Sequence, residues 1–287
     1  IPIKSGFAAV TGLPNSGKST LINALIGESL LITSAKSQTT RRQFRCILTG
    51  ADYQLVLVDT PGLHAPKNKL GEFMAREIES SLANSDLVLY VLDASRPQEL
   101  APVFPANKPV ILVLNKTDLL FPKKVEELVG DFQKDRRFAG VVPISAVGRT
   151  NLPALIQAVV QYLPEGEFLY PADQLMDCDY RLLAAELIRE QALLQLEDEV
   201  PHGIAVEIVS FSETEDEALI QANVIVERDS HKGIVIGRGG GMLKAIGTGA
   251  RLQLENLLEK TVHLKLWVKV NKNWRKDPNR LKWLGYK

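Results

Sequence analysis

The segment from Gly12 to Ser19 constrains the fold of this chain more than any other. Its residues, GLPNSGKS, match G-x-x-x-x-G-K-[ST], follow an apolar run at 7–10 and open an amphipathic stretch at 18–26. A glycine-rich turn between a buried strand and a helix lets backbone N–H groups surround phosphates at the helix N-terminus. The pattern therefore predicts a P-loop nucleotide-binding domain of the α/β class.

Apolar runs alternate with amphipathic stretches as far as residue 163. Buried strands that alternate with helices indicate βαβ units and a mostly parallel sheet. One further run, 42–49, is compatible with an antiparallel edge strand. We expect the other strands at 7–10, 55–58, 87–92, 110–114 and 141–144, and helices at 18–26, 70–82, 125–132 and 152–163.

The segment LPEGEFLYPADQ, with two prolines and a glycine, then breaks this alternation. After it we expect a helix at 180–197, strands at 204–211 and 222–227, a helix at 242–259 and a strand at 262–270. Leu182, Leu183, Leu187, Leu194 and Leu196 would supply the apolar face of the first helix. The sequence thus predicts a nucleotide-binding domain at 1–166, a linker at 167–179 and a smaller α+β domain at 180–287, in the order α-β-β-α-α-β.

Composition and charge narrow the class of protein. The 287 residues are 45% hydrophobic, contain no apolar run of 18 and start without a signal-peptide pattern, so we expect a cytoplasmic protein. Cys46 and Cys178 fit no disulfide or metal framework. The net charge is zero, yet 228–287 holds 14 Lys/Arg against 4 Asp/Glu. This +10 segment favours a nucleic-acid partner.

Residues at later strand ends complete a guanine-nucleotide site. In NKTD, the Asp118 carboxylate can accept both N1–H and the 2-amino group of guanine, whereas adenine would leave it unpaired. Asn115 would brace the loops, the Lys116 stem would cover the base, and Ala146 would read the guanine oxygen. The expected GTP/GDP-binding residues are Gly12, Pro14, Asn15, Ser16, Gly17, Lys18, Ser19, Thr20, Asp59, Gly62, Asn115, Lys116, Asp118, Ser145 and Ala146.

DTPG and QTT supply the expected catalytic and Mg²⁺-binding groups. Lys18, Thr40 and Gly62 are the predicted catalytic residues, with Gly62 sensing the γ-phosphate; Ser19, Thr40 and Asp59 are the predicted Mg²⁺ residues, with Thr39 less favoured than Thr40. Leu63 stands where Ras-like enzymes place a water-orienting Gln, so we expect slow intrinsic hydrolysis. The following His64 is more typical of a solvated loop than of a catalytic base. Asn15 either supports a stimulating K⁺ or only shapes the turn.

A second glycine loop, GRGG, spans Gly237 to Gly240. Met242 occupies the position of the last glycine in a dinucleotide fingerprint, which excludes that interpretation. G-x-x-G is the loop with which KH domains clamp about four nucleotides of single-stranded RNA. We expect Ile234, Ile236, Ile246 and Leu252 to form the groove wall and core. The predicted RNA-binding residues are Lys232, Gly237, Arg238, Gly239, Gly240, Lys244, Lys269, Lys272, Trp274 and Arg275, although the tail aromatics could equally pack to hold the tail down.

Together, GLPNSGKST, QTTRR, DTPGL, NKTD, SA, VIGRGG and HLKLWVKV make the chain resemble the Era family of GTPases along essentially its whole length. The resemblance implies a GTPase domain joined to a type II KH domain. It also implies a ribosome-biogenesis factor that binds 16S rRNA near its 3′ end and assists assembly of the 30S subunit. It further implies a monomer that associates peripherally with the inner membrane, for which no lipid anchor or strongly basic amphipathic helix is present.

Other functions remain open at this point. A GTP-regulated protein could act on another RNA, at the membrane or in the cell cycle. An RNA-modifying enzyme would need a catalytic nucleophile or metal cluster, and the cysteines and four histidines are scattered. A metabolic P-loop kinase is disfavoured by NKTD and DTPG.

Overall fold

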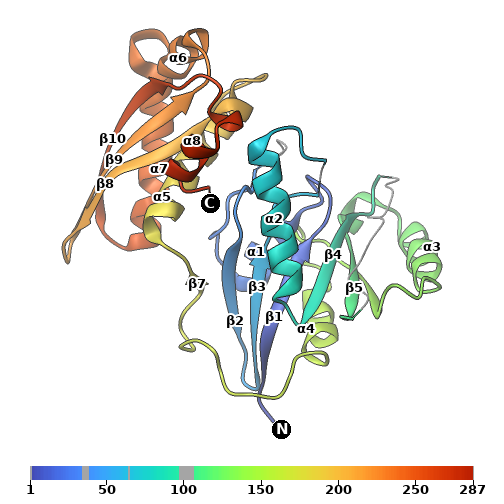
Figure 1. Ribbon diagram of the computed structural model, residues 1–287. Helices are drawn as coiled ribbons and strands as arrows, with labels where there is room; N and C mark the ends of the chain where they lie inside the picture. Colours follow the sequence, from blue (N-terminus) through green and yellow to red (C-terminus); the bar gives the residue numbers. More distant parts are fainter. Residues whose placement is uncertain (1, 34–38, 64, 97–106, 287) are drawn as a thin grey trace. The chain divides into compact units, whose positions relative to one another are not determined.

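The computed structural model describes residues 2–33, 39–63, 65–96 and 107–286. It divides into two compact units. The first unit comprises Ile1–Leu31, Thr40–Ala65 and Met74–Asp177, and the second comprises Ile32–Thr39, Pro66–Phe73 and Cys178–Lys287. Figure 1 labels most of the helices and strands of both. The domain limits expected at residues 166 and 180 stay a prediction.

The first unit is built on a sheet that, within the described residues, has seven strands in the order β6-β5-β4-β1-β3-β2-β7. β1 pairs in parallel with β3 and β4, β5 pairs in parallel with β4 and β6, and β2 is antiparallel to β3. The predicted α/β class and the antiparallel pairing are therefore confirmed, but β2 is not the expected edge strand, because β7 pairs with its other side. The strands are β1 (Lys4–Thr11), β2 (Phe44–Thr49), β3 (Tyr53–Asp59), β4 (Leu87–Asp93), β5 (Val110–Asn115), β6 (Gly140–Pro143) and β7 (Met176–Asp177).

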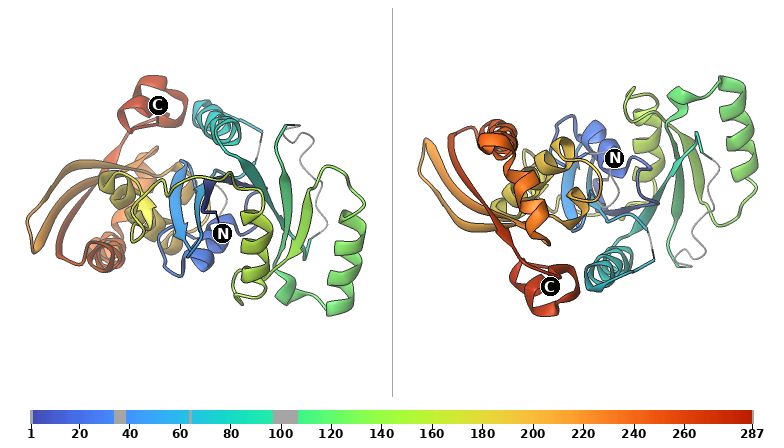
Figure 2. Two further views of the ribbon diagram at one scale, coloured as in Figure 1. Left: turned by 90° about the horizontal axis from the view of Figure 1, so that it is seen from below. Right: turned by 90° about the horizontal axis from the view of Figure 1, so that it is seen from above.

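Helices lie on both faces of this sheet, with α2 on one face and α1 and α4 on the other (Figure 2). β4 is buried along its whole length, which explains its continuous apolar sequence. Its Val88, Tyr90 and Leu92 pack with Leu82 of α2 and Leu128 of α3. The bounds are α1 (Lys18–Ile26), α2 (Lys69–Ala83), α3 (Pro122–Phe132) and α4 (Leu152–Val160).

The segment expected to be a linker packs along this sheet. The side chain of Gln54 accepts hydrogen bonds from the backbone N–H groups of Leu169 and Tyr170 and donates one to the Tyr170 carbonyl, at 2.7, 2.9 and 2.9 Å. The two residues of β7 then pair with β2. Residues 169–177 are thus tied to the first unit.

The second unit has a three-stranded sheet in the order β10-β9-β8, with β9 parallel to β10 and antiparallel to β8. Helices α5 and α7 pack on each other and on this sheet. Ile188 of α5, Val224 of β9 and Ile246 of α7 share its core. Leu194, expected on the apolar face of α5, is instead 54% exposed.

The order of elements in this unit agrees with the predicted α-β-β-α-α-β, although no range was predicted for the helix α6 ahead of the glycine loop, and a short helix follows in the tail. The elements are α5 (Tyr180–Gln195), β8 (Ala205–Glu213), β9 (Glu217–Val226), α6 (Asp229–Ile236), α7 (Gly241–Leu258), β10 (Thr261–Val270) and α8 (Pro278–Trp283).

Candidate functional site

The phosphate loop follows β1 and has glycine where only glycine fits. Gly12 has φ 147°, and a Cβ there would lie 2.2 Å from the Val91 carbonyl oxygen. Gly17 has φ 95°, and a Cβ there would lie 2.2 Å from Asn115 Nδ2. The loop therefore lies close against the ends of β4 and β5, and α1 begins directly after Gly17.

Lys18 lies at the start of α1 with its ammonium turned back onto the loop. Its Nζ donates to the carbonyl oxygens of Gly12 and Leu13 at 3.2 and 3.0 Å. Burial lowers the pKa of Lys18 to about 8, an effect that the carboxylate of Asp59 opposes. Bound phosphates would favour the charged form of this amine. Thr20, two residues further along the helix, is half-buried. Asn15 is exposed and has a left-handed backbone conformation.

The three predicted Mg²⁺ residues converge. Ser19 Oγ donates to Asp59 Oδ2 at 2.8 Å, Thr40 Oγ1 donates to the same atom at 3.2 Å, and the two hydroxyl oxygens are 3.1 Å apart. Asp59 Oδ1 is buried and has no hydrogen-bond partner among the described residues. Burial raises the pKa of this carboxyl to about 6, opposed by Lys18 and by the two hydroxyls. One carboxylate and two hydroxyls, with an oxygen left over, fit the hard-oxygen preference of Mg²⁺.

The DTPG loop is held against the phosphate loop. A Cβ on Gly62 would lie 2.9 Å from Pro14 Cα, so the two backbones approach closely. The Leu63 N–H donates to the Gly12 carbonyl at 3.0 Å, and its side chain packs on the core beside β4. Leu63 thus serves packing, as expected of a residue that cannot orient water. His64 lies outside the described residues.

Asn115 joins three loops, as predicted for a bracing residue. Its Nδ2 donates to the Ser16 carbonyl at 2.9 Å, and its Oδ1 accepts from the Ala146 N–H at 3.0 Å. The Ala146 amide, expected to read the guanine oxygen, is therefore engaged with Asn115 in this structure. Its contact with the guanine oxygen stays a prediction.

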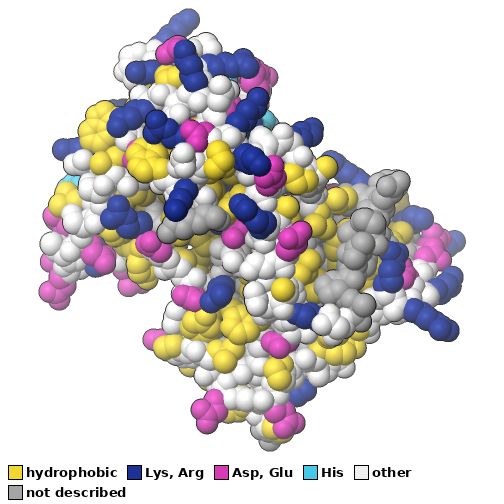
Figure 3. Space-filling model, viewed as in Figure 1, with side chains coloured by type: hydrophobic (Ala, Val, Ile, Leu, Met, Phe, Trp, Pro, Cys, Tyr) yellow, Lys and Arg dark blue, Asp and Glu magenta, His cyan; other side chains and the backbone are white. Residues whose placement is uncertain are grey.

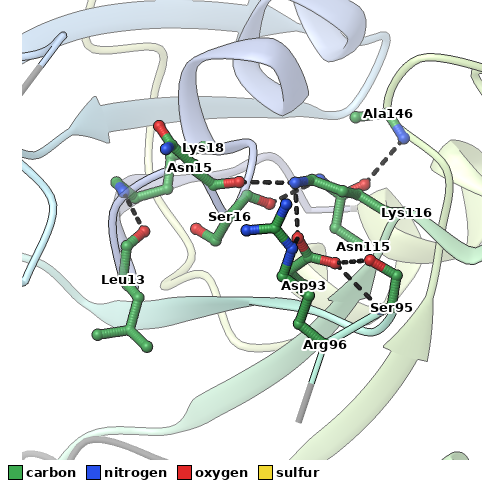
Figure 4. A network of polar contacts seen from close by, with 10 residues as sticks. All are labelled: Leu13, Asn15, Ser16, Lys18, Asp93, Ser95, Arg96, Asn115, Lys116 and Ala146. Atoms are coloured by element: carbon green, nitrogen blue, oxygen red, sulfur yellow. Dashed lines mark hydrogen bonds and ion pairs between the residues drawn. The ribbon is translucent and has the colours of Figure 1, made fainter. Parts of the chain in front are cut away.

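Lys116 and Asp118 of NKTD have side-chain partners of their own. Ser145 Oγ donates to Asp118 Oδ1 at 2.5 Å, which holds the exposed carboxylate in place. Lys116 Nζ donates to the Asn15 carbonyl at 2.7 Å and to Asp93 Oδ2 at 2.6 Å (Figure 4). Sequence reasoning missed Asp93. The signal that could have found it is its place at the carboxyl end of a parallel strand, where ligands bind.

The glycines of the second loop are of two kinds, those with no room for a Cβ and those with open space at that position. A Cβ on Gly237 would lie 2.6 Å from the Met242 Cβ, whereas Gly239 and Gly240 have open space at their Cβ positions although their φ values are 57° and 79°. Lys232, Arg238 and Lys244 are exposed. Figure 3 shows Lys and Arg side chains spread over the visible face of this unit.

A groove of about 350 Å³ runs beside this loop. Its lining combines apolar side chains from α7 and β10 with two cationic side chains, as RNA bases and phosphates require. Gly240, Leu243, Lys244, Gly247, Thr248, Arg251, Leu264 and Leu266 line it. The predicted wall and core were partly wrong, because Ile234 and Leu252 are about half exposed and do not line the groove, whereas Ile246 is buried in the core as expected.

Several side chains that were predicted to bind RNA do not line the groove. Trp274 is 0% exposed and its Nε1 donates to the Gly203 carbonyl at 2.9 Å, so its predicted stacking on bases is wrong. Arg275 is ion-paired with Glu227. Lys269 lies an odd number of residues from the groove-lining Leu264 and Leu266, so it faces away from the groove. Lys272 is exposed, and its Nζ lies 3.8 Å from Asp229 Oδ2.

Known proteins resemble the chain along its whole length. Residues 7–116 match the family described as 50S ribosome-binding GTPase, and 199–275 match the KH domain. The chain is 43% identical over 294 residues to GTPase Era of Ruminiclostridium cellulolyticum, covering 99% of the chain and 98% of the relative. It is 45% identical over 291 residues to GTPase Era of Clostridium perfringens, with the same coverage.

Two solved structures superpose on nearly the whole chain. One is Era in complex with MgGDPNP and nucleotides 1506–1542 of 16S ribosomal RNA, with a TM-score of 0.94, 39% identity and 99% of each chain covered. The other is a variant of Aquifex aeolicus Era bound to GDP·AlF4⁻, with a TM-score of 0.93, 39% identity and 99% of each chain covered.

Proposed function

The chain belongs to the Era family of GTPases, and on that premise we propose that it uses GTP hydrolysis to control binding of the 3′ end of 16S rRNA during assembly of the 30S subunit. The observation that carries the proposal is the superposition, over 99% of each chain and at 39% identity, on a relative solved with both a GTP analogue and this RNA. The match includes both glycine loops, so neither half of the function rests on a separate likeness.

In the proposed nucleotide site, the phosphate loop and Lys18 bind the phosphates, and Asp118 reads the guanine edge. Ser19, Thr40 and Asp59 would hold Mg²⁺. When bound, the ion neutralises charge on the β- and γ-phosphates. Gly62 lies where its loop meets the phosphate loop, which suits a sensor of the γ-phosphate. Asn15 is the proposed support for K⁺.

In the proposed RNA site, the groove beside Gly237–Gly240 takes single-stranded RNA. Open space at Gly239 and Gly240 lets phosphates approach the backbone, and Lys244 and Arg251 line the groove with positive charge. Leu264 and Leu266 offer apolar contact to bases. Phosphate contacts would make the affinity fall steeply with salt.

We also propose a monomeric, cytoplasmic protein. Among the described residues, no helix is both long and apolar enough to cross a membrane. Peripheral association with the inner membrane follows from the family resemblance alone.

Crosslinking of the full chain to cellular RNA tests the proposal. We expect crosslinks concentrated at the 3′ end of 16S rRNA, carried by the groove residues, and GTP-dependent in yield. Purified protein should hydrolyse GTP and not ATP. Crosslinks spread evenly over other RNAs would contradict the RNA assignment, and equal binding of ATP and GTP would contradict the nucleotide assignment.

A further inference from the structure

One buried carboxylate of the first unit has no part in the proposed function. Asp93 is the last residue of β4, is 1% exposed and lies beside Asn115 in the register of β4 and β5. Its Oδ1 accepts from the backbone N–H and the hydroxyl of Ser95, at 3.0 and 2.6 Å. Its Oδ2 accepts from the Lys116 ammonium at 2.6 Å.

Lys116 is held by more than this carboxylate. Its backbone is left-handed, with φ 64°, and its Nζ also donates to the Asn15 carbonyl of the phosphate loop at 2.7 Å. The ammonium at the end of the lysine stem thus links the end of β4 to the phosphate loop (Figure 4). Arg96 lies further off, with Nε 4.0 Å from Asp93 Oδ2 and a side chain 73% exposed.

The negative charge of Asp93 indicates that this residue binds Lys116 and does not only close a turn. The hydrogen bonds from Lys116 and Ser95 outweigh burial and hold the pKa of Asp93 below its ordinary value, so the carboxylate is charged at neutral pH. An asparagine would serve a turn closed by Ser95 equally well. Only the bond to the ammonium is strengthened by a negative charge on the acceptor.

We propose that Asp93 is a positioning residue for nucleotide binding, fixing Lys116 so that its stem covers the guanine base and its ammonium keeps the Asn15 segment of the phosphate loop closed. The inference rests on the proposed nucleotide site. Asp93 itself touches neither base nor phosphate. Its loss should therefore speed dissociation of guanine nucleotides without changing the preference for guanine, which Asp118 sets.

The test measures dissociation of a fluorescent GDP analogue from the full chain in Mg²⁺ buffer. Asp93→Asn keeps the Ser95 turn and removes the charge, and we expect dissociation about tenfold faster, as for loss of one charge-assisted bond. Lys116→Met keeps the stem and should act similarly. The double variant should release the analogue no faster than Lys116→Met, because Lys116→Met already removes the bond to Asp93 together with the bond to the Asn15 carbonyl. Asp86→Asn is the matched control, since Asp86 precedes the same strand and accepts from the Phe7 N–H at 2.8 Å, and it should leave dissociation unchanged.

Folding is followed by the thermal unfolding midpoint. If Asp93→Asn does not fold, the double variant is compared with Lys116→Met instead. The double variant leaves no unpaired buried charge, and equal dissociation rates in these two variants support the inference. Dissociation within twofold of the unaltered chain in Asp93→Asn, or additive effects in the double variant, would overturn it. Failure of Lys116→Met to change dissociation, or of the unaltered chain to bind the analogue, would instead refute the proposed nucleotide site and the inference with it.

Discussion

Ser145 Oγ lies 2.5 Å from Asp118 Oδ1, and the same oxygen of Ser145 accepts the Gly148 N–H at 2.9 Å. A loop hydroxyl with both a donor and an acceptor role thereby fixes an exposed carboxylate. Asp118 is oriented before guanine arrives, and the two residues should contribute to guanine affinity in very different amounts.

Replacing Asp118 with Asn should weaken GDP binding at least about a hundredfold, because two hydrogen bonds to a charged group are lost. Ser145→Ala should cost about tenfold or less, because the carboxylate remains. Titration of each variant with fluorescent GDP and ADP analogues measures both effects. A larger loss in Ser145→Ala than in Asp118→Asn would contradict the assigned roles.

The second glycine loop allows a closely matched pair of variants. Gly239→Asp should reduce affinity for single-stranded RNA at least about tenfold, because a negative charge faces the phosphates. Gly239→Asn has the same shape without the charge, and both residues tolerate the left-handed conformation. RNA binding by fluorescence anisotropy should separate the two, while GDP affinity stays equal. Parallel loss of RNA and GDP binding would refute the separation of the two sites.

Trp274 should matter for folding. Trp274→Ala should destabilise the protein by about 3–5 kcal/mol, because a fully buried ring is removed. Trp283→Ala is the control, since Trp283 is 53% exposed, and it should change the unfolding free energy by less than about 0.5 kcal/mol. Urea unfolding measures both. An unaltered unfolding free energy in Trp274→Ala would show that the ring is not part of the core.

Binding of Mg²⁺ should weaken as the pH falls through about 6. The raised pKa of Asp59 means that its carboxyl gains a proton below that pH, and a protonated carboxyl is a poor ligand. The apparent Mg²⁺ affinity of the GDP complex should thus be full above pH 6 and fall by up to about tenfold per pH unit below it. Titrations at pH 7.5 and 5.5 test this.

Asp59→Asn serves as the control for that titration, because any pH dependence it keeps comes from groups other than Asp59, such as the nucleotide phosphates. Equal pH dependence in this variant and in the unaltered chain would show that Asp59 is not the titrating group.

Strongly patterned elements could be predicted from the sequence. The α1 bounds 18–26 agree with the structure, and the strands at 87–92 and 110–114 each end one residue early. Apolar runs and helical periodicity, bounded by glycine and proline, mark such elements locally. β7 has only two residues and no alternation, so nothing in the sequence marks it, and it exists because β2 offers it an edge.

The site residues also divide into those that the sequence predicts and those that only the fold reveals. Motif residues such as Lys18 and Asp118 follow from spacing. The burial of Trp274 depends on the Gly203 carbonyl, 71 residues away, and cannot be read from the basic tail around it. Asp93 belongs to no motif; its place at a strand end marks it as a candidate, but its partner Lys116 is known only from the fold.

Asn115 shows how the nucleotide site meets its ligand. Its amide holds the phosphate loop and the Ala146 loop together through bonds that need no nucleotide. The conformational entropy of ordering these loops is therefore lost during folding and not at each encounter with GTP. Association should then depend mainly on diffusion and orientation, and variants around this pocket should differ chiefly in how long the nucleotide stays bound.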